Sequence, residues 1–345
     1  MLRFEADQII DAMLPLTIPI LRLLSDAEFH SGEVLAQRLN VSRASVCNAL
    51  HNVAELGIEL YKVRGRGYQM PLPIDWLERD RVLPHLGEQA EAIRLTLRDV
   101  VDSTNTQLLN SVALAETHGQ CLAAEIQTQG RGRRGRVWQG MLGGSLTFSL
   151  AWQFNLGVAQ LSGLSLAVGV AIARALQTLG ITQLQLKWPN DLLHSYHKLG
   201  GVLIEVQGDA LGPSATVIGV GLNYRLSTQA KHLIDQAAID LFSLKTDIHS
   251  RNQVLGVVLR HLAEALSVFE RAGFSAFREE WLSLHAYQGK PIALRLPDGS
   301  EVLGVLRDVS EDGMLVLETS NGEKRFGSGE ISMRPRSPVM RSHSA

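Results

Sequence analysis

The chain has few of the features that mark secreted, membrane-bound or metal-binding proteins. Its 345 residues include only two cysteines, Cys47 and Cys121. Their spacing matches no metal site, so a reducing compartment is favoured. No apolar run predicts a transmembrane helix. The first residues are acidic where a signal peptide would have a basic flank and an apolar core. These absences predict a cytoplasmic protein that does not contact membranes.

Several patterns that would indicate a particular chemistry are also missing. The eleven histidines show no metal-ligand spacing, so we predict no metal site built from side chains. No nucleophile and base are arranged in a way that requires a catalytic triad. The formal net charge is −2, so any contact with nucleic acid must come from a local basic patch.

The residues that are present are typical of a globular protein with two or three domains. Hydrophobic residues make up 45% of the chain and charged residues 20%, which is enough apolar material for a sizeable core. Helix and strand patterns are mixed and have no fixed repeat. We therefore predict an α+β fold.

Residues 1–70 predict three short helices and a hairpin. An apolar helix over Thr17–Leu24 precedes two helices capped by Ser31 and Ser42. The third helix has an apolar face of Val46, Ala49, Leu50 and Val53, and an opposite face of Arg43, Ala44, Cys47, Asn48 and His51. Such a pair of helices, joined by a short turn, resembles a helix-turn-helix.

The segment Tyr61–Tyr68 then predicts a hairpin wing with a basic tip. Residues 1–70 contain seven Lys or Arg against eight Asp or Glu, so the positive charge is concentrated rather than spread over the domain. DNA contacts are expected from Ser42, Arg43, Asn48, Arg64 and Arg66. A small helical interaction module that does not bind DNA is the alternative.

Pro71–Asp75 marks a boundary, and residues 71–287 predict the central domain. Helical character is expected at Trp76–Leu83. Strands are expected at Ile93–Val100, Cys121–Ile126, Ser145–Phe154, Leu184–Trp188, Lys198–Glu205 and Thr216–Asn223. Helices are expected from Ser103 through Val112, and over Leu161–Leu179, Asn252–Arg271 and Ser275–His285. This order favours a mixed, largely antiparallel sheet.

Residues 288–335 predict a small SH3-like β-barrel. Short alternating strands are separated by the hairpin signals Asp298-Gly299, Asp312-Gly313 and Asn321-Gly322. The remaining residues, 336–345, predict a disordered tail.

The stretch Gly130–Arg136, here called the arginine loop, contains four arginines and three glycines in seven residues. It matches the dinucleotide fingerprint G-x-G-x-x-G, which requires a helix after its last glycine. The following residues predict a turn and a strand, so a Rossmann site is excluded. A P-loop is excluded because no Gly-Lys-Ser/Thr follows.

Guanidinium groups suit phosphate and carboxylate oxygens, and glycines let the backbone approach a ligand closely. We therefore expect the arginine loop to bind an anion. It should be mobile when empty and ordered when occupied. A nucleic-acid-binding tail is the alternative, but the loop lies in mid-chain between two apolar strands.

Three further clusters of the central domain hold polar residues at strand or helix ends. They are Ser103-Thr104-Asn105, Lys187-Trp188-Pro189-Asn190-Asp191 and Lys198-Leu199-Gly200-Gly201. Taken alone, the first is more often a helix cap, and Lys187 is more often a solvated charge. Lys198 is as readily a turn residue as an ATP contact, Asp191 could brace its turn or hold a metal, and Glu205 suits a structural partner.

Together, the arginine loop and the Lys-Trp-Pro-Asn-Asp motif resemble the bifunctional biotin–protein ligases that also repress the biotin operon. The resemblance covers almost the whole chain. It implies a winged helix, a class II synthetase-like ligase domain and a small β-barrel. Lipoate ligases share the ligase fold but lack this pair of motifs and the winged helix.

The resemblance implies ATP and biotin as substrates, with Mg²⁺ on the ATP. Biotinyl-5′-AMP forms first, and biotin then passes to a lysine of a biotin carboxyl carrier protein. Catalytic roles are implied for Lys187, Arg131 and Arg133. Biotin or biotinyl-AMP contacts are implied for Ser103, Thr104, Asn105, Gln127, Arg131, Gly132, Arg133, Trp138, Lys187, Gly200 and Gly201.

The resemblance also implies binding to operator DNA of biotin-synthesis genes, as a homodimer when biotinyl-AMP is bound. Two alternatives remain open. One is a regulator whose ligase domain only senses biotin, although the intact motifs argue against it. The other is a ligase whose winged helix merely packs. The third helix carries little positive charge beyond Arg43, so one copy of the winged helix is expected to bind DNA weakly.

Overall fold

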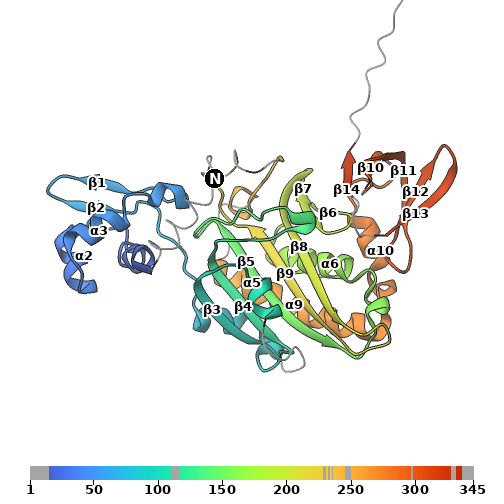
Figure 1. Cartoon of the computed structure of the whole chain (residues 1–345), viewed down its shortest axis with the longest axis horizontal. Helices are drawn as coiled ribbons and strands as arrows, with labels where there is room; N and C mark the ends of the chain where they lie inside the picture. Colours follow the sequence, from blue (N-terminus) through green and yellow to red (C-terminus); the bar gives the residue numbers. More distant parts are fainter. Residues whose placement is uncertain are drawn as a thin grey trace, which may run out of the picture.

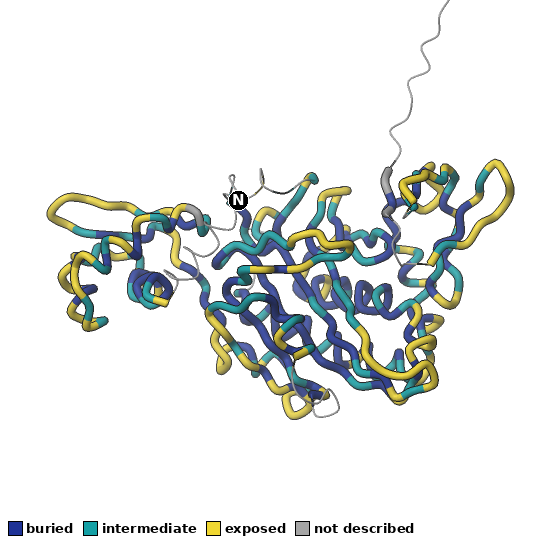
Figure 2. The backbone as a smooth tube through the Cα atoms, viewed as in Figure 1, coloured by how far each residue is buried: buried dark blue, intermediate teal, exposed yellow. Residues whose placement is uncertain are grey.

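A computed structural model describes residues 15–110, 117–227, 231, 234, 236–244, 250–296, 298–327 and 332–335. The predicted tail, 336–345, lies outside these residues, as does Val112. In Figure 1 the N-terminal helices and the C-terminal sheet lie at opposite ends of a central domain. Figure 2 shows that the central sheet is mostly buried and that the hairpin tips at both ends are exposed.

The N-terminal domain is the predicted winged helix. A helix over residues 15–23 is followed by α2 (Gly32–Leu39), α3 (Arg43–Ala49), η1 (Val53–Leu56) and a wing of β1 (Tyr61–Val63) and β2 (Gly67–Gln69). Ser31 and Ser42 cap α2 and α3, because each hydroxyl accepts a hydrogen bond from the backbone N–H three residues later. Val46, Ala49, Leu50 and Val53 are buried as predicted, but Val53 belongs to η1 because α3 ends at Ala49.

The central domain is built on a seven-stranded sheet in the order β3-β4-β5-β9-β8-β7-β6. Its strands are β3 (Arg94–Val101), β4 (Gln120–Gln127), β5 (Ser145–Phe154), β6 (Leu184–Lys187), β7 (Asp191–His194), β8 (His197–Gly208) and β9 (Ser214–Asn223). Only the β3–β4 pairing is parallel. The predicted mixed, largely antiparallel sheet is confirmed, although β7 was not predicted.

The two faces of this sheet are covered differently. Long helices α6 (Leu164–Thr178), α9 (Arg251–Ala272) and α10 (Ser275–Leu284) cover one face. The short helix α5 (Thr104–Leu109) packs on the other, where Leu108 meets Leu122 of β4. Side chains alternate along a strand, so Cys121 and Ala123 face the long helices.

The prediction that no run could cross a membrane needs a correction. The segment Val158–Thr178 spans η6 (Val158–Leu161) and α6. Judged by length and composition alone, it is long and apolar enough to cross a membrane. However, 61% of its most apolar window is buried inside the protein. Helices that are apolar all round are also found in the cores of folded domains. Here α6 packs against α9 and the sheet.

The C-terminal domain is a five-stranded antiparallel sheet in the order β13-β12-β11-β10-β14. The strands are β10 (Pro291–Arg295), β11 (Glu301–Val309), β12 (Leu315–Thr319), β13 (Gly322–Phe326) and β14 (Ser332–Pro335). Gly299, Gly313 and Gly322 all adopt positive φ, as the predicted hairpin turns require. The Trp188 indole N–H donates to Gly313 O at 3.1 Å, which ties this domain to the central one.

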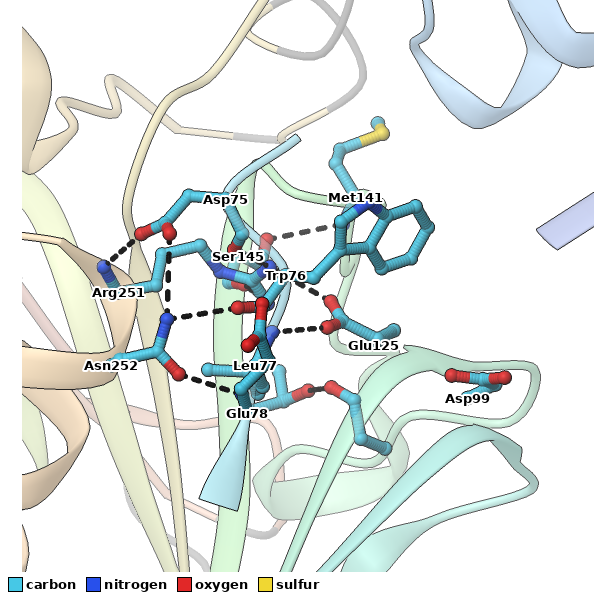
Figure 3. Close-up of polar contacts among 12 residues, drawn as sticks. Asp75, Trp76, Leu77, Glu78, Asp99, Glu125, Met141, Ser145, Arg251 and Asn252 are labelled. Atoms are coloured by element: carbon cyan, nitrogen blue, oxygen red, sulfur yellow. Dashed lines mark hydrogen bonds and ion pairs between the residues drawn. The ribbon is translucent and has the colours of Figure 1, made fainter. Parts of the chain in front are cut away.

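The segment between the first two domains is held by a buried polar network (Figure 3). Arg251 at the start of α9 is fully buried, and its guanidinium lies 2.8 Å from the carboxylate of Glu125 in β4. It also donates to Asp75 O and Ser145 O, each at 3.0 Å. On the opposite side of the segment, the Trp76 indole donates to Ser25 Oγ at 2.7 Å.

The same network shortens the helix predicted at Trp76–Leu83. The backbone N–H of Leu77 donates to Glu125, and that of Glu78 donates to Asn252. The backbone of Glu78 is extended, with φ −133° and ψ 126°, so the helix begins only at α4 (Arg79–Val82).

We expect Arg251→Met to lower the free energy of unfolding by about 3–5 kcal/mol, because it leaves the Glu125 carboxylate buried without its partner. The matched control is Arg307→Met, whose partner Glu318 is 53% exposed. This variant should lose less than about 1 kcal/mol. Urea unfolding of both variants and the wild type checks this. Equal losses would show that burial does not set the cost of removing Arg251.

His285 follows α10 and is buried, with neither ring nitrogen hydrogen-bonded. Its ring stacks on Trp281 with centroids 4.5 Å apart. Burial lowers the pKa of His285 from its ordinary 6.5 to about 3. Between these two values the unfolded chain holds one more proton at this position than the folded chain does. Stability should therefore fall as the pH drops below 6.5.

We expect His285→Phe to remove this part of the acid sensitivity. Between pH 7 and pH 5 the wild type should lose roughly 2 kcal/mol more than the variant, from one proton over about 1.5 pH units. Urea unfolding of both proteins at the two pH values measures the difference. Identical losses would mean that His285 is already protonated, or accessible to protons, in the folded protein.

Candidate functional site

A cavity of about 480 Å³ opens on the α5 face of the central sheet. It is lined by residues of β4 to β9, the start of α5, the arginine loop and Met333 of β14. Its volume suits a bound small molecule or nucleotide.

The floor of the cavity is a row of residues directly opposite one another on neighbouring strands. Strand pairing places them in the order Thr147, Gly221, Gly201, Asp191 and Lys187. Residues paired in this way point to the same face of a sheet. Thus Lys187 of β6 and Gly201 of β8, predicted as site residues, lie on one surface although β7 separates their strands.

The glycines of this floor make room for other side chains. A Cβ on Gly221 would lie 2.5 Å from the Trp138 indole, and one on Gly219 would lie 2.2 Å from Asn105 Oδ1. The Gly219-Val220-Gly221 alternation of β9 was a sequence signal for a strand face without side chains, and the prediction did not use it. Gly200, by contrast, does not line the cavity. A Cβ there would lie 2.6 Å from Leu222.

One end of the cavity is neutral and polar. Ser103, Thr104 and Asn105 are buried at the start of α5, and the Ser103 hydroxyl caps that helix. Gln127 Oε1 accepts a hydrogen bond from Thr104 N at 2.7 Å. Ser149, which was not predicted, lies 2.7 Å from Thr104 Oγ1 through its hydroxyl. This end therefore offers several hydrogen-bonding groups and no net charge.

The rest of the cavity lining is cationic. Among the described lining residues, six are cationic and one is acidic: Arg131, Arg133, Arg134, Arg136, Lys187 and Lys198 against Asp191. Asp191 lies 2.7 Å from Lys198 Nζ and 3.8 Å from Lys187 Nζ. One carboxylate thus holds both lysines, and the cavity keeps a positive excess that favours an anionic ligand.

The arginine loop lines the cavity as an irregular hairpin between β4 and β5. Gly132 N donates to Arg136 O at 2.8 Å, and Trp138 N donates to Gly130 O at 2.9 Å. Its tip is η5 (Arg133–Gly135), in which Arg134 adopts φ 59°. No helix follows, so the exclusion of a Rossmann site is confirmed.

Two arginines fasten the loop to the rest of the site. Arg131 Nη2 lies 2.8 Å from a carboxylate oxygen of Glu205, and Arg133 Nη1 donates to Asn190 Oδ1 at 3.3 Å. Burial lowers the pKa of Arg133, and the nearby charge of Asp191 opposes that shift. The structure thus brings Arg131, Gly132, Arg133, Trp138 and Lys187 together around one cavity.

The residues predicted to contact DNA lie apart from this cavity. Ser42, Arg43 and Asn48 are exposed on α3, and Arg64 and Arg66 are exposed on the wing. The Arg66 guanidinium stacks on the Phe29 ring, 3.9 Å from its centroid. The Ser42 hydroxyl is engaged as the cap of α3.

Comparison with known proteins extends over nearly the whole chain. Residues 97–223 match the Biotin/lipoate A/B protein ligase family, residues 18–69 an HTH domain, and residues 287–334 the Biotin protein ligase C terminal domain. "Bifunctional ligase/repressor BirA" of Salmonella typhimurium is 35% identical over 324 residues, covering 94% of this chain and 98% of that protein. The chain belongs to the bifunctional biotin ligase–repressor family.

Two further similar proteins support the assignment. The Escherichia coli (strain K12) protein of the same name is 34% identical, with 92% of this chain and 98% of that protein covered. The structure of biotin protein ligase from Aquifex aeolicus in complex with biotin and ATP has a TM-score of 0.60 and 30% identity. It covers 70% of this chain and 99% of that chain. The predicted resemblance to the family is confirmed.

Proposed function

We propose that the protein is an ATP-dependent biotin–protein ligase that also represses transcription of biotin-synthesis genes. The charge distribution in the cavity supports the ligase activity most directly. A neutral polar end lies beside a cationic end with six Lys or Arg residues against one Asp. Biotin and ATP together have the same distribution of charge, because biotin joins a neutral ureido ring to a carboxylate and ATP adds a triphosphate.

In the first step, a biotin carboxylate oxygen attacks the α-phosphorus of ATP, and pyrophosphate leaves. Two anions must meet, so the cations lower the barrier mainly by neutralising charge and positioning the reactants. Lys187 lies at the cationic end of the floor, where its ammonium can neutralise both reacting groups. Arg131 and Arg133 provide planar donors for phosphate oxygens.

In the second step, the amine of an acceptor lysine attacks the carbonyl of biotinyl-AMP, and AMP leaves. The acceptor is a biotin carboxyl carrier protein. Ser103, Thr104, Asn105 and Gln127 hold the ureido ring, and Trp138 provides an apolar wall. Gly132 and Gly201 give the ligand space. Gly200 has no contact with the ligand in this proposal, because a Cβ there would meet Leu222 and not the cavity.

Mg²⁺ would arrive with the triphosphate and shield its charge. The residues of the cavity fit an ion carried in by ATP better than they fit a permanently bound metal ion. In the described part of the chain, no three His, Cys, Asp or Glu residues gather around a common point. Asp191 is the one carboxylate among the described lining residues. Mg²⁺ often binds through substrate phosphates and one or two carboxylates.

For the repressor activity, α3 and the wing are proposed to contact operator DNA. Ser42, Arg43 and Asn48 would meet the major groove, and Arg64 and Arg66 the backbone. The proposed domains are residues 1–70, 71–287 and 288–335, with a tail of 336–345. The protein would act in the cytoplasm, as a homodimer on DNA when biotinyl-AMP is bound.

Transfer of labelled biotin to a carboxyl carrier domain tests the ligase activity. Label should reach the carrier only when ATP is present, and a carrier with its acceptor Lys→Arg should stay unlabelled. Binding of biotin without transfer would favour a regulator that only senses biotin. Transfer without any binding to DNA upstream of biotin-synthesis genes would favour a ligase whose winged helix merely packs.

A further inference from the structure

Glu205 lies on the cavity face of β8, two residues beyond Leu203, but does not line the cavity itself. Its sequence context, an apolar strand, predicts only a structural partner. In the structure a single carboxylate oxygen, Oε2, lies 2.8 Å from Asn105 Nδ2 and 2.8 Å from Arg131 Nη2. Those two groups belong to the neutral end of the cavity and to the arginine loop, respectively.

The Glu205 carboxylate fixes which way the Asn105 amide points. Asn105 Nδ2 faces Glu205 Oε2 and also the backbone carbonyl of Leu203, at 3.3 Å. Both of these groups can only accept hydrogen bonds when Glu205 is ionised. The amide nitrogen must therefore point toward them, which leaves Asn105 Oδ1 beside Ser149. Asn105 Oδ1 accepts a hydrogen bond from the Ser149 hydroxyl at 2.5 Å and keeps a second lone pair for a ligand N–H group.

The same carboxylate counters the mutual repulsion within the arginine loop. The loop packs four guanidinium groups into seven residues, and Arg131 is 42% exposed while Glu205 is 27% exposed. A resident carboxylate at its base gives the loop an anionic anchor. Asn105 at the neutral end of the cavity and Arg131 of the arginine loop are therefore joined through one oxygen atom.

We propose, on the basis of the proposed ligase function, that Glu205 is a positioning residue. It orients Asn105 for the ureido ring and holds the arginine loop closed over biotinyl-AMP. Glu205 does not touch the reacting atoms. Its role is to keep the intermediate in the cavity until the acceptor lysine arrives, since an open site would lose a reactive adenylate.

Two substitutions separate the two contacts. Glu205→Gln keeps a carbonyl acceptor for Asn105 but removes the charge paired with Arg131. Biotin affinity should change less than about threefold, while biotinyl-AMP should dissociate roughly fivefold faster, the size expected for a partly exposed ion pair. Glu205→Ala removes both contacts, so biotin affinity should fall roughly tenfold as well.

The experiment loads each protein with labelled biotin and ATP without acceptor, then measures release of labelled adenylate after excess unlabelled biotin and ATP are added. Calorimetry gives the biotin affinity, and thermal unfolding confirms that the variants fold. Glu318→Gln is the matched control, because it removes an exposed ion pair with Arg307 far from the cavity. It should release adenylate at the wild-type rate.

A double-mutant cycle with Arg131→Gln identifies the contact. If the pair acts as proposed, Glu205→Gln should have little further effect on release once Arg131 is replaced. Two results would overturn this inference alone, provided that the wild type makes adenylate normally. One is additive effects of the two substitutions, and the other is release of adenylate by Glu205→Gln at the wild-type rate. If the wild type formed no adenylate, both the proposed function and this inference would be wrong.

Discussion

Replacing Lys187 with alanine should slow the formation of biotinyl-AMP by about 100- to 1,000-fold, which is typical for loss of one preorganised group that stabilises transition-state charge. The Lys187 side chain is 15% exposed and sits at the end of the cavity floor, 3.8 Å from Asp191. An ammonium that neutralises two anions as they meet contributes most at the transition state. The loss should therefore appear in the rate, and biotin affinity should change much less.

Single-turnover formation of labelled biotinyl-AMP measures this effect, with calorimetry for biotin binding. Arg136→Ala is the useful comparison, because it removes one positive charge from an exposed part of the same cavity lining. Its rate should fall less than about tenfold. Equal losses in the two variants would mean that only the total charge of the cavity matters. An unchanged rate in Lys187→Ala would remove this residue from the mechanism.

The second large effect is expected on DNA. Biotinyl-AMP should raise operator affinity at least about 100-fold by promoting a homodimer. One winged helix has few exposed basic groups, so a single copy should bind weakly. Two linked copies add their contacts through effective concentration. We expect closure of the arginine loop to favour the dimer, and this coupling must also tighten adenylate binding by the same factor.

Sedimentation and operator binding test this switch, each measured without ligand, with biotin alone, and with biotin plus ATP. Only the last condition should give both the dimer and the tight complex. Excess unmodified acceptor should then weaken DNA binding until it is biotinylated, if acceptor and dimer use overlapping surfaces. Equal dimerisation and equal DNA affinity in all three conditions would refute the switch and leave the ligase activity standing.

Much of this fold could be predicted because its signals are local. Helix caps such as Ser31 and Ser42, alternating strands and Asp-Gly or Asn-Gly turns each depend on a few neighbouring residues. Strand β7 (Asp191–His194) was missed because it is short and directly follows the Pro189-Asn190 turn, so it has too few residues to show a local pattern. The helix predicted at Trp76 was too long, because contacts with Glu125 and Asn252, which are distant in the sequence, hold Leu77 and the extended Glu78 outside it.

The site was predictable only in part. The arginine loop and the Lys187–Asp191 motif are contiguous, so they could be found by pattern. The contact between Asn105 and Glu205 joins residues 100 positions apart, and its existence depends on strand register. No local pattern fixes that register. The role of Gly219 and Gly221 likewise depends on the fold, because the side chains that need their space, Asn105 and Trp138, are distant in the sequence.

The central claim is that this cavity joins biotin to AMP, and pyrophosphate exchange tests it most directly. The purified protein is mixed with ATP and labelled pyrophosphate, without any acceptor, and incorporation of label into ATP is followed. Reversible adenylation predicts rapid incorporation that requires biotin and is nearly abolished in Lys187→Ala. No incorporation with biotin present, or incorporation that is the same without biotin, would contradict the account.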